Sequence, residues 1–281
     1  MHVSNDWVSL ARRDIYSQDG EDGIIETILA VLPKEDLDNF CVEFGAWDGI
    51  HCCNTRHLIE TKNYSAVLIE ADKKRFEQLQ RNYSSRATVF PVNAFVGFTP
   101  SDNLDVILSE FPIPVKFDLL SVDIDGNDYH VWKAVKNFHP KIVCIEFNPT
   151  IPNEVNYIQA ADANVSKGSS LKAFNELAKS KSYELVALSA WNAFFVLKEY
   201  FHLFKITDNT PEALRTDKRF ITWLFFGIDG AVHLDGNKTM AWHGLPIKEE
   251  KLQLLPKRLR KNPFWYSKVD RIMFRIFKRL K

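Results

Sequence analysis

The stretch FCVEFGAWDG, residues 40–49, decides the fold class of this chain. Its first five residues are apolar apart from Glu43, as in a strand that is buried within a sheet. Gly45 and Gly49 then allow the backbone to turn tightly and to approach a ligand closely. In an open α/β sheet, ligands bind at the carboxyl ends of the strands. The stretch therefore predicts a buried strand that runs into a ligand-binding turn.

On both sides of this stretch, short apolar runs alternate with amphipathic runs of helical period. The pattern predicts strands over residues 40–44, 65–70, 88–93, 117–124, 141–147, 183–188 and 192–197. It predicts helices over residues 20–32, 53–62, 72–83 (capped by Asp72), 102–110, 128–137 and 169–181. Such alternation implies crossover connections and a mostly parallel central sheet that is covered on both faces. We therefore expect an α/β fold of three layers, and the pattern is less regular after residue 200.

The composition excludes several classes of protein. The chain has 281 residues, of which 46% are hydrophobic, so it can bury a sizeable core. Its 36 Lys and Arg balance 36 Asp and Glu, which argues against a uniformly basic nucleic-acid-binding protein. The four cysteines form neither a zinc-binding pattern nor a disulfide framework. The N-terminal residues lack the apolar core of a signal peptide, and no apolar run approaches the roughly 18 residues of a membrane span. We expect a cytoplasmic protein.

The charge is distributed unevenly. Residues 248–281 hold 12 Lys and Arg against 3 Asp and Glu, whereas residues 1–247 hold 24 against 33. This contrast predicts a main domain over residues 1–247 and a basic amphipathic appendage over residues 248–281. Within residues 263–281, one helical stripe is apolar and consists of Trp265, Val269, Ile272, Met273, Ile276 and Leu280. Lys and Arg lie mostly opposite, which is typical of a helix in an anionic membrane interface.

We therefore expect residues 263–281 to contact an anionic membrane or glycolipid surface peripherally, on the inner face of a membrane. An oligomer contact and a helix docked on the sheet are the alternatives. We expect no nucleic acid partner, since no nucleic-acid-binding motif accompanies the charge.

The carboxylates near the first turn indicate the kind of ligand. The G-x-G-x-x-G spacing of a dinucleotide site is absent, and Glu43 would lie near the position of a pyrophosphate. The second strand ends in Glu70, where a carboxylate can accept both hydroxyls of a ribose. An adenosine ligand with a positively charged end suits both acids, and S-adenosylmethionine is such a ligand.

The motifs EFGAWDG, IEAD, VNAFVG and LLSVDIDGNDYHVW occur here in this order, with SQDGEDGII before them and CIEFNPTIP after them. This set resembles the FkbM-like group of class I S-adenosylmethionine-dependent methyltransferases over about residues 15–200. The resemblance implies a Rossmann-like methyltransferase fold and O-methyl transfer to a sugar hydroxyl of a glycan or glycolipid. It also implies cofactor contacts for Gln18, Asp19, Glu43, Gly45, Ala46, Gly49, Glu70, Ala71, Asn93, Ala94 and Asp123. A capping or surface role is the alternative for each.

An acidic cluster follows the fourth and fifth predicted strands. Asp123 and Asp125 come after the fourth strand, and Glu146 and Asn148 end the fifth, so all four are expected at the rim that carries the glycine turn. One interpretation is a general base, Asp125, Asp123 or His130, that takes a proton from a sugar hydroxyl. Another is Mg²⁺ held by Asp123, Asp125, Glu146 and Asn148.

The metal interpretation is weakened at one position. The segment resembles the D-G-D-x-Y stretch of metal-dependent sugar O-methyltransferases, but Asn127 replaces the second Asp. A third interpretation is purely structural: the acids cap the helix over 128–137 and hold the turn, a role that suits Asp128 best.

Two other functions stay open from sequence alone. The chain could methylate a small metabolite or a lipid, or it could be a catalytically silent Rossmann-like module that binds glycans or membranes. A nicotinamide-dependent oxidoreductase is disfavoured by the spacing of the glycines.

Overall fold

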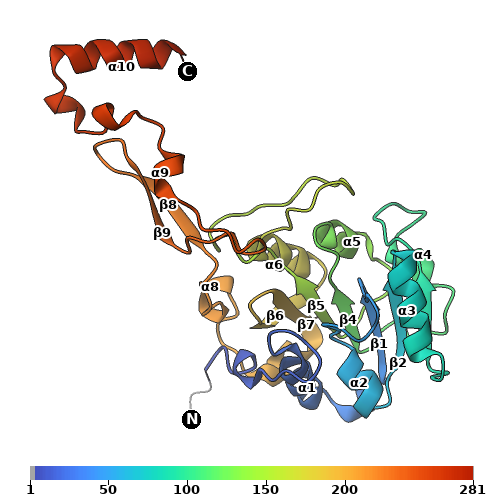
Figure 1. Cartoon of the computed structure of the whole chain (residues 1–281). Helices are drawn as coiled ribbons and strands as arrows, with labels where there is room; N and C mark the ends of the chain where they lie inside the picture. Colours follow the sequence, from blue (N-terminus) through green and yellow to red (C-terminus); the bar gives the residue numbers. More distant parts are fainter. Residues whose placement is uncertain (1–3, 281) are drawn as a thin grey trace. The chain divides into compact units, whose positions relative to one another are not determined.

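The computed structural model describes residues 4–280, which divide into two compact units, one ending at Asp217 and one beginning at Lys218. The first unit contains a seven-stranded sheet in the order β3-β2-β1-β4-β5-β7-β6 (Figure 1). Its strands are β1 (Phe40–Phe44), β2 (Ser65–Glu70), β3 (Val89–Asn93), β4 (Leu119–Val122), β5 (Ile142–Glu146), β6 (Tyr183–Leu188) and β7 (Asn192–Leu197). Its helices are α1 (Glu21–Val31), α2 (Arg56–Thr61), α3 (Lys73–Tyr83), α4 (Leu104–Leu108), α5 (Asp128–Ala134), α6 (Leu171–Ser180), α7 (Lys198–Phe201) and α8 (Pro211–Leu214).

The pairing of the strands creates a switch point in the sheet. Strands β3, β2, β1, β4 and β5 pair in parallel, whereas β7 pairs antiparallel with both β5 and β6. The chain moves outward from β1 through β2 to β3, and then returns to the other side of β1 as β4. Right-handed crossovers that run in opposite directions place their helices on opposite faces, and Figure 1 shows helices on both sides of the sheet. The predicted three-layer α/β fold with a mostly parallel sheet is confirmed, and the switch point lies between β1 and β4.

The predicted strands and helices of this unit are present, and most differences lie at helix ends. Asp72 caps α3 as predicted, because its side chain accepts a hydrogen bond from the backbone N–H of Arg75 at 2.9 Å. The helix predicted over 53–62 begins only at Arg56, and the backbone N–H groups of Asn54 and Thr55 just before it bind the side chain of Glu43.

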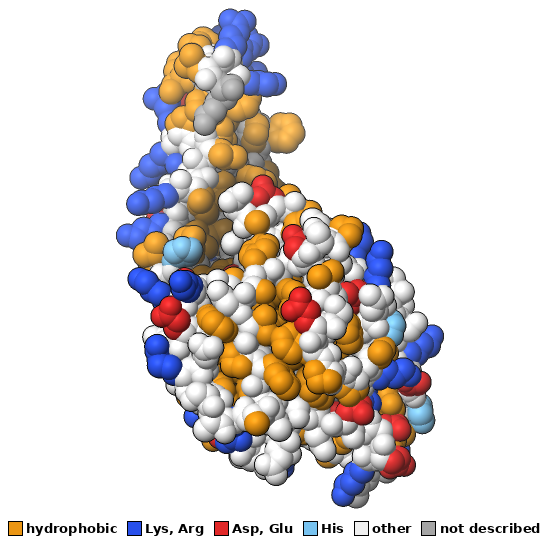
Figure 2. Space-filling model, turned by 90° about the vertical axis from the view of Figure 1, so that its right-hand side faces the viewer, with side chains coloured by type: hydrophobic (Ala, Val, Ile, Leu, Met, Phe, Trp, Pro, Cys, Tyr) orange, Lys and Arg blue, Asp and Glu red, His pale blue; other side chains and the backbone are white. Residues whose placement is uncertain are grey.

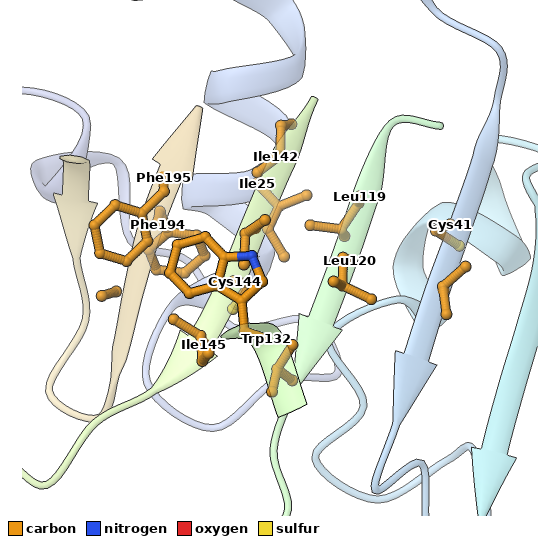
Figure 3. Close-up of a cluster of buried hydrophobic side chains, with 14 of the residues drawn as sticks. Ile25, Cys41, Leu119, Leu120, Trp132, Ile142, Cys144, Ile145, Phe194 and Phe195 are labelled. Atoms are coloured by element: carbon orange, nitrogen blue, oxygen red, sulfur yellow. The ribbon is translucent and has the colours of Figure 1, made fainter. Parts of the chain in front are cut away.

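The core of the unit lies on both faces of the central strands. Figure 3 shows Leu119 and Leu120 of β4 beside Ile142 and Ile145 of β5, all of them buried. From α5, the ring of Trp132 packs 5.3 Å from that of Phe195 in β7 and 5.7 Å from that of Tyr183 in β6. The carboxyl ends of the strands are therefore held by a continuous apolar core.

The second unit begins earlier than the charge pattern predicts. It contains a hairpin of β8 (Thr222–Phe226) and β9 (Val232–Gly236), then α9 (Glu249–Leu252) and α10 (Lys268–Leu280). The amide of Gln253 binds both backbone groups of Val232, at 2.9 and 2.7 Å, and so joins the hairpin to the chain around α9. The predicted boundary at residue 247 is therefore corrected to residue 217, since the change of charge falls inside the second unit.

Of the helix predicted over residues 263–281, α10 covers Lys268–Leu280, whereas Pro263–Trp265 form a separate 3-10 turn and Lys281 lies outside the described residues. Within residues 4–280, no helix is both long and apolar enough to cross a membrane.

Candidate functional site

A cavity of about 500 Å³ lies at the carboxyl ends of β1, β2 and β4. This volume is typical of a site for a small molecule. Seven residues of its wall were predicted to belong to the site: Gln18, Gly45, Glu70, Ala71, Ala94, Asp123 and Asp125. The remaining wall includes Trp47, His51, Cys52, Arg75, Phe95, Val96, Phe98, Asn127, Ala163, Val165 and Ser166.

Gly45 allows the turn after β1 to pack directly on the end of β4. Its φ is +78°, and a Cβ there would lie 1.7 Å from the carbonyl oxygen of Asp123. The backbone N–H groups of Gly45 and Ala46 both donate to the carbonyl of Ile69, each at 3.1 Å, which fixes the turn against β2. A side chain at position 45 would therefore displace the segment that carries Asp123.

Two other residues of this turn have a packing role. A Cβ on Gly49 would lie 2.5 Å from the ring of Tyr83 and 2.6 Å from Leu79, so this glycine serves the contact with α3. Ala46 is buried and does not line the cavity. The cofactor contacts predicted for Gly49 and Ala46 are therefore replaced by packing roles beneath the turn.

The side chain of Glu43 binds the segment that follows β1. It is buried, and its carboxyl group accepts hydrogen bonds from the N–H of Asn54 at 3.0 Å, the N–H of Thr55 at 3.2 Å and the hydroxyl of Thr55 at 2.6 Å. The thiol of Cys53 adds a fourth contact at 2.8 Å. Glu43 does not line the cavity. The predicted direct contact with a cofactor is therefore corrected: Glu43 shapes the site by holding residues 53–55.

The carboxyl group of Glu70 is placed so that it can accept hydrogen bonds from a ligand in the cavity. Glu70 ends β2 at the cavity wall, where one carboxyl oxygen accepts from the N–H of Trp47 at 2.9 Å and the other from the N–H of Asp72 at 2.7 Å. A carboxylate oxygen has two lone pairs, so each can still accept a hydroxyl of a ligand. Asn93 lies behind this group and donates to the carbonyl oxygens of Glu70 and Ala71, at 2.8 and 3.2 Å. It holds the turn and does not line the cavity.

An aromatic wall adjoins Glu70. The guanidinium of Arg75 lies 4.1 Å from the ring centroid of Trp47, and Phe95, Val96 and Phe98 follow β3 along the same cavity. Trp47 has a φ of +50°, which is rare for a residue other than glycine and directs the chain back across the turn. Flat apolar side chains of this kind can pack against the ring of a planar ligand.

The N-terminal segment contributes one wall residue. Gln18 lines the cavity, whereas Asp19 does not. The side chain of Asp19 accepts from the N–H of Ala190 at 2.5 Å and lies 3.7 Å from the guanidinium of Arg12. Asp19 therefore anchors this segment to the turn between β6 and β7, and its predicted cofactor contact is not in place.

Three carboxyl groups meet beside the switch point. One oxygen each of Asp123, Asp125 and Glu146 lie within 4.8 Å of one another. Within residues 4–280 no group donates a hydrogen bond to any of these three side chains. Burial, with the nearby Asp128 and Asp125, raises the pKa of Asp123 well above its ordinary value, and burial with Asp123 raises the pKa of Glu146. The group therefore retains a proton at neutral pH unless a cation balances its charge.

Asp128 holds the turn, as the structural interpretation predicted for it. Its two carboxyl oxygens accept from the N–H groups of Ile124 and Gly126, both at 2.9 Å. Burial raises its pKa to about 6. It is the first residue of α5 and does not cap the helix, because Asn127 occupies the cap position. The interpretation does not extend to Asp123 or Asp125, whose side chains accept no hydrogen bond from a backbone group among residues 4–280.

The metal site stays a prediction, and three of its four predicted residues lie close together. The oxygens of Asp123, Asp125 and Glu146 are donors that Mg²⁺ prefers, and their spacing fits one ion. Asn148 does not join them, because its side-chain oxygen accepts from the N–H and the hydroxyl of Thr150 at 2.9 and 2.6 Å. The amide nitrogen of Asn148 donates to the carbonyl of Lys167 at 2.7 Å. Asn148 is therefore wrong as a metal ligand.

His130 does not face the cavity in the way that the predicted general base requires. Its Nε2 lies 2.8 Å from the carbonyl oxygen of Gln159. A carbonyl can only accept, so Nε2 carries the hydrogen and has no lone pair to offer a substrate. His130 does not line the cavity, and its ring packs 5.6 Å from that of Phe98. Its contact holds the loop that follows β5.

A second hollow, of about 720 Å³, lies along α1 and the segment before β1. Its wall includes Arg13 and Lys62, and both pair with Glu26. It lies near the amino ends of the strands and away from the acidic cluster. The cavity beside Glu70 is therefore the better candidate site.

No known protein family matches this sequence, and no curated protein matches it. The chain does share an arrangement of elements with solved methyltransferases. The CMeT domain of citrinin polyketide synthase is 10% identical at a TM-score of 0.40, over 63% of this chain and 50% of that domain. A putative caffeoyl-CoA O-methyltransferase from Staphylococcus aureus is 12% identical at a TM-score of 0.42, over 63% of this chain and 82% of that one. TrmK from M. capricolum, solved with S-adenosylhomocysteine, is 11% identical at a TM-score of 0.37, over 61% of this chain and 67% of TrmK.

One of these neighbours is a putative O-methyltransferase, and this chain spans half of the length of the CMeT domain. At such low identities and TM-scores, the likeness assigns neither a family nor a substrate to this chain. The strand order and the cavity described above rest on the coordinates of the chain itself.

Gln159 is a site residue that the sequence did not reveal. It is buried, its side-chain oxygen accepts from the N–H groups of Lys167 and Gly168 at 2.9 Å, and its nitrogen donates to the carbonyl of Val165 at 2.9 Å. It thereby places Ala163, Val165 and Ser166 in the cavity wall. A Cβ on Gly126 would lie 2.9 Å from the same carbonyl of Val165. The absence of a side chain at Gly126 therefore allows the loop around Val165 to pack closely against the turn after β4. A glutamine inside an irregular loop gives no periodic pattern to detect.

Proposed function

We propose that this protein is an S-adenosylmethionine-dependent O-methyltransferase that acts on a sugar hydroxyl of a glycan or glycolipid. The observation that carries the proposal is the position of Glu70. Its carboxyl group lies at the end of β2, in the wall of a cavity at the switch point, and each oxygen retains an accepting position.

The rest of the cavity supports the same ligand. The aromatic wall that includes Trp47 and Phe95 suits the adenine ring. Asp123 and its neighbours provide negative charge for the sulfonium and the ammonium group at the other end. When bound, this cofactor supplies an electrophilic methyl group. Methyl transfer then needs mainly alignment of the acceptor oxygen with that methyl.

Asp125 is our candidate for the general base. It lines the cavity, is exposed, and has an unusual φ of +56° at the turn after β4. Asp125 would accept the proton of the sugar hydroxyl as the acceptor oxygen takes the methyl group and the carbon–sulfur bond breaks. Asp123 and Glu146, whose pKa values are raised by burial, would retain a proton between them. A Mg²⁺ ion held by the three carboxylates is the alternative way to balance their charge.

The sugar acceptor rests on the resemblance to the FkbM-like group, and the exposure of Asp125 agrees with a large acceptor. The first experiment is calorimetric titration of the full chain with S-adenosylhomocysteine, in EDTA and in Mg²⁺. We expect micromolar binding, and about a hundredfold loss in Glu70→Ala from two hydrogen bonds to a charged group. Glu77→Gln, which changes an exposed acid on α3, is the matched control.

Absence of binding in both buffers would refute the proposal. If binding is present, radiolabelled S-adenosylmethionine and a panel of glycans, glycolipids, lipids and small metabolites test the acceptor. Asp125→Asn should abolish turnover while S-adenosylhomocysteine binding stays within a few-fold of the parent. Tight cofactor binding with no acceptor in any class would favour a catalytically silent module.

A further inference from the structure

The hairpin of the second unit exposes apolar side chains on both of its faces. Trp223, Leu224, Phe225 and Phe226 are consecutive in β8, and all four are exposed. Consecutive side chains of a strand point to opposite faces, so neither face of this strand is covered. Ile228, in the turn that follows, is 83% exposed. A hairpin of this kind in water exposes much more apolar surface than a monomeric domain usually does.

The apolar stripe of α10 is also uncovered. Val269, Ile272, Ile276 and Leu280 are all exposed. Trp265, just before the helix, is 76% exposed. The two apolar surfaces therefore belong to the same compact unit and are both open.

Contacts on another side of α10 fix the helix within the unit. Asp270 is buried and accepts from the N–H of Ser267 at 2.9 Å, while the hydroxyl of Ser267 accepts from the N–H of Asp270 at 3.2 Å. This reciprocal pair is a capping box. The same carboxylate pairs with Lys261 at 2.7 Å and with Arg258 at 3.2 Å. The helix is thus anchored by its first turn, and its apolar stripe remains available.

The charge of the unit selects among the possible partners. Residues 218–281 contain 15 Lys and Arg against 5 Asp and Glu. In the upper part of Figure 2, blue Lys and Arg side chains border the orange hydrophobic ones of this unit. Two copies of such a surface would repel each other, and a nucleic acid would leave the aromatic side chains uncovered. An anionic lipid surface attracts the positive charge and can also bury the apolar side chains.

We propose that residues 218–281 form a membrane-binding unit that inserts two elements, the turn of the β8–β9 hairpin and the apolar stripe of α10, into the interface of an anionic bilayer. The exposed Arg271, Arg275 and Lys278 contact the headgroups. This inference does not depend on the proposed methyltransferase activity. It extends the sequence prediction, which assigned membrane contact to residues 263–281 alone, to a second element.

The test is co-sedimentation of the full chain with vesicles of phosphatidylcholine, alone or mixed with phosphatidylserine. We expect binding to the mixed vesicles that weakens as salt is added. Arg271→Gln/Arg275→Gln/Lys278→Gln should weaken binding on the order of 100-fold, since each charge contributes about fivefold. Phe226→Ser/Ile228→Ser should weaken it about tenfold or more for each side chain, by loss of apolar burial.

Matched changes in the first unit are the controls. Lys73→Gln/Lys74→Gln/Lys179→Gln removes three exposed charges, and Leu10→Ser/Val115→Ser removes two exposed apolar side chains. Both should bind mixed vesicles as the parent does, and circular dichroism should show that every variant is folded. Glu70→Ala should also bind vesicles normally, which separates this proposal from the methyltransferase proposal.

Three outcomes would overturn the proposal. One is equal binding, or no binding, to the two kinds of vesicle. The second is parental vesicle binding by the hairpin variant, which would remove the hairpin as an inserted element. The third is a parent chain that does not bind vesicles but forms a dimer in light scattering, when the hairpin substitutions abolish that dimer. This result would assign the apolar surface to contact with a second copy of the chain.

Discussion

Replacing Glu146 by glutamine should stabilise the first unit at neutral pH. Burial and the neighbouring Asp123 raise the pKa of Glu146, so the folded protein binds a proton there that the unfolded chain releases. Glutamine preserves the shape of the protonated side chain and needs no proton. The substitution thus removes the cost of protonation without opening a cavity.

The magnitude follows from the ordinary pKa of the side chain. An unperturbed Glu has a pKa of 4.5. Keeping it protonated at pH 7 costs about 1.4 kcal/mol for each pH unit above that value, or about 3 kcal/mol in total. Since the folded pKa is raised, this cost is absent below the unfolded pKa and grows as pH rises towards the folded pKa. The gain in Glu146→Gln should therefore be near zero at about pH 4.5 and increase by about 1.4 kcal/mol per unit above it.

Equilibrium unfolding in urea, in the presence of EDTA and across this pH range, measures the difference between the variant and the parent. The transition of the first unit is followed by far-ultraviolet circular dichroism. Glu77→Gln provides the control, since this exposed side chain has no carboxyl neighbour of the cluster. A free-energy difference that is independent of pH, or a variant less stable than the parent at pH 7, would refute the reasoning. The same variant should lose methyl transfer if the cluster serves catalysis.

Three further substitutions test the turns and the terminal helix. Gly45→Ala should cost about 3 kcal/mol or more and abolish binding of S-adenosylhomocysteine, because its Cβ would lie 1.7 Å from a carbonyl oxygen; thermal denaturation and calorimetry measure both effects. Glu43→Ala should cost about 3 kcal/mol in urea unfolding, because it leaves the N–H groups of Asn54 and Thr55 without their acceptor. Asp270→Ala should speed amide exchange across α10, measured by mass spectrometry, while binding of S-adenosylhomocysteine is unchanged.

For each of these three substitutions, one result would contradict the expectation. Parental stability and binding in Gly45→Ala would mean that the turn does not pack on β4 as described. Glu43→Gln retains one acceptor oxygen, so a loss equal to that of Glu43→Ala would point to charge as the important property. Unchanged exchange in Asp270→Ala would show that other contacts hold the first turn of α10.

The sheet could be predicted because its strands are short apolar runs, most of them separated by amphipathic helices. Glu70 and Gly45 were found for a related reason: a carboxylate or a glycine at the end of a buried strand is placed by the topology alone. Glu43 lies on the same kind of strand, but its partners at residues 53–55 depend on how the next turn folds. The sequence shows which edge of the sheet a side chain reaches, and not which donors meet it there.

Two parts of the chain escaped prediction for physical reasons. The hairpin of β8 and β9 lacks the alternation of apolar and polar residues that marks a half-buried strand, because both faces of β8 are apolar and exposed. The loop after β5 has no period at all, and a single side chain, Gln159, organises it through three backbone contacts. Such contacts can be recognised only when the coordinates are available.

The way in which Gln159 organises that loop has a consequence for which residues of the cavity wall can vary in sequence. The sheet-end turns form one side of the cavity, whereas Ala163, Val165 and Ser166 form another from a segment that Gln159 holds together. Residues at these three positions can be exchanged without altering a strand of the sheet or the side chains of Glu70 and Asp123. Random mutagenesis confined to residues 160–166 should therefore yield libraries of folded proteins with altered acceptor preference, and natural variation in acceptor choice would be expected to concentrate in the same segment.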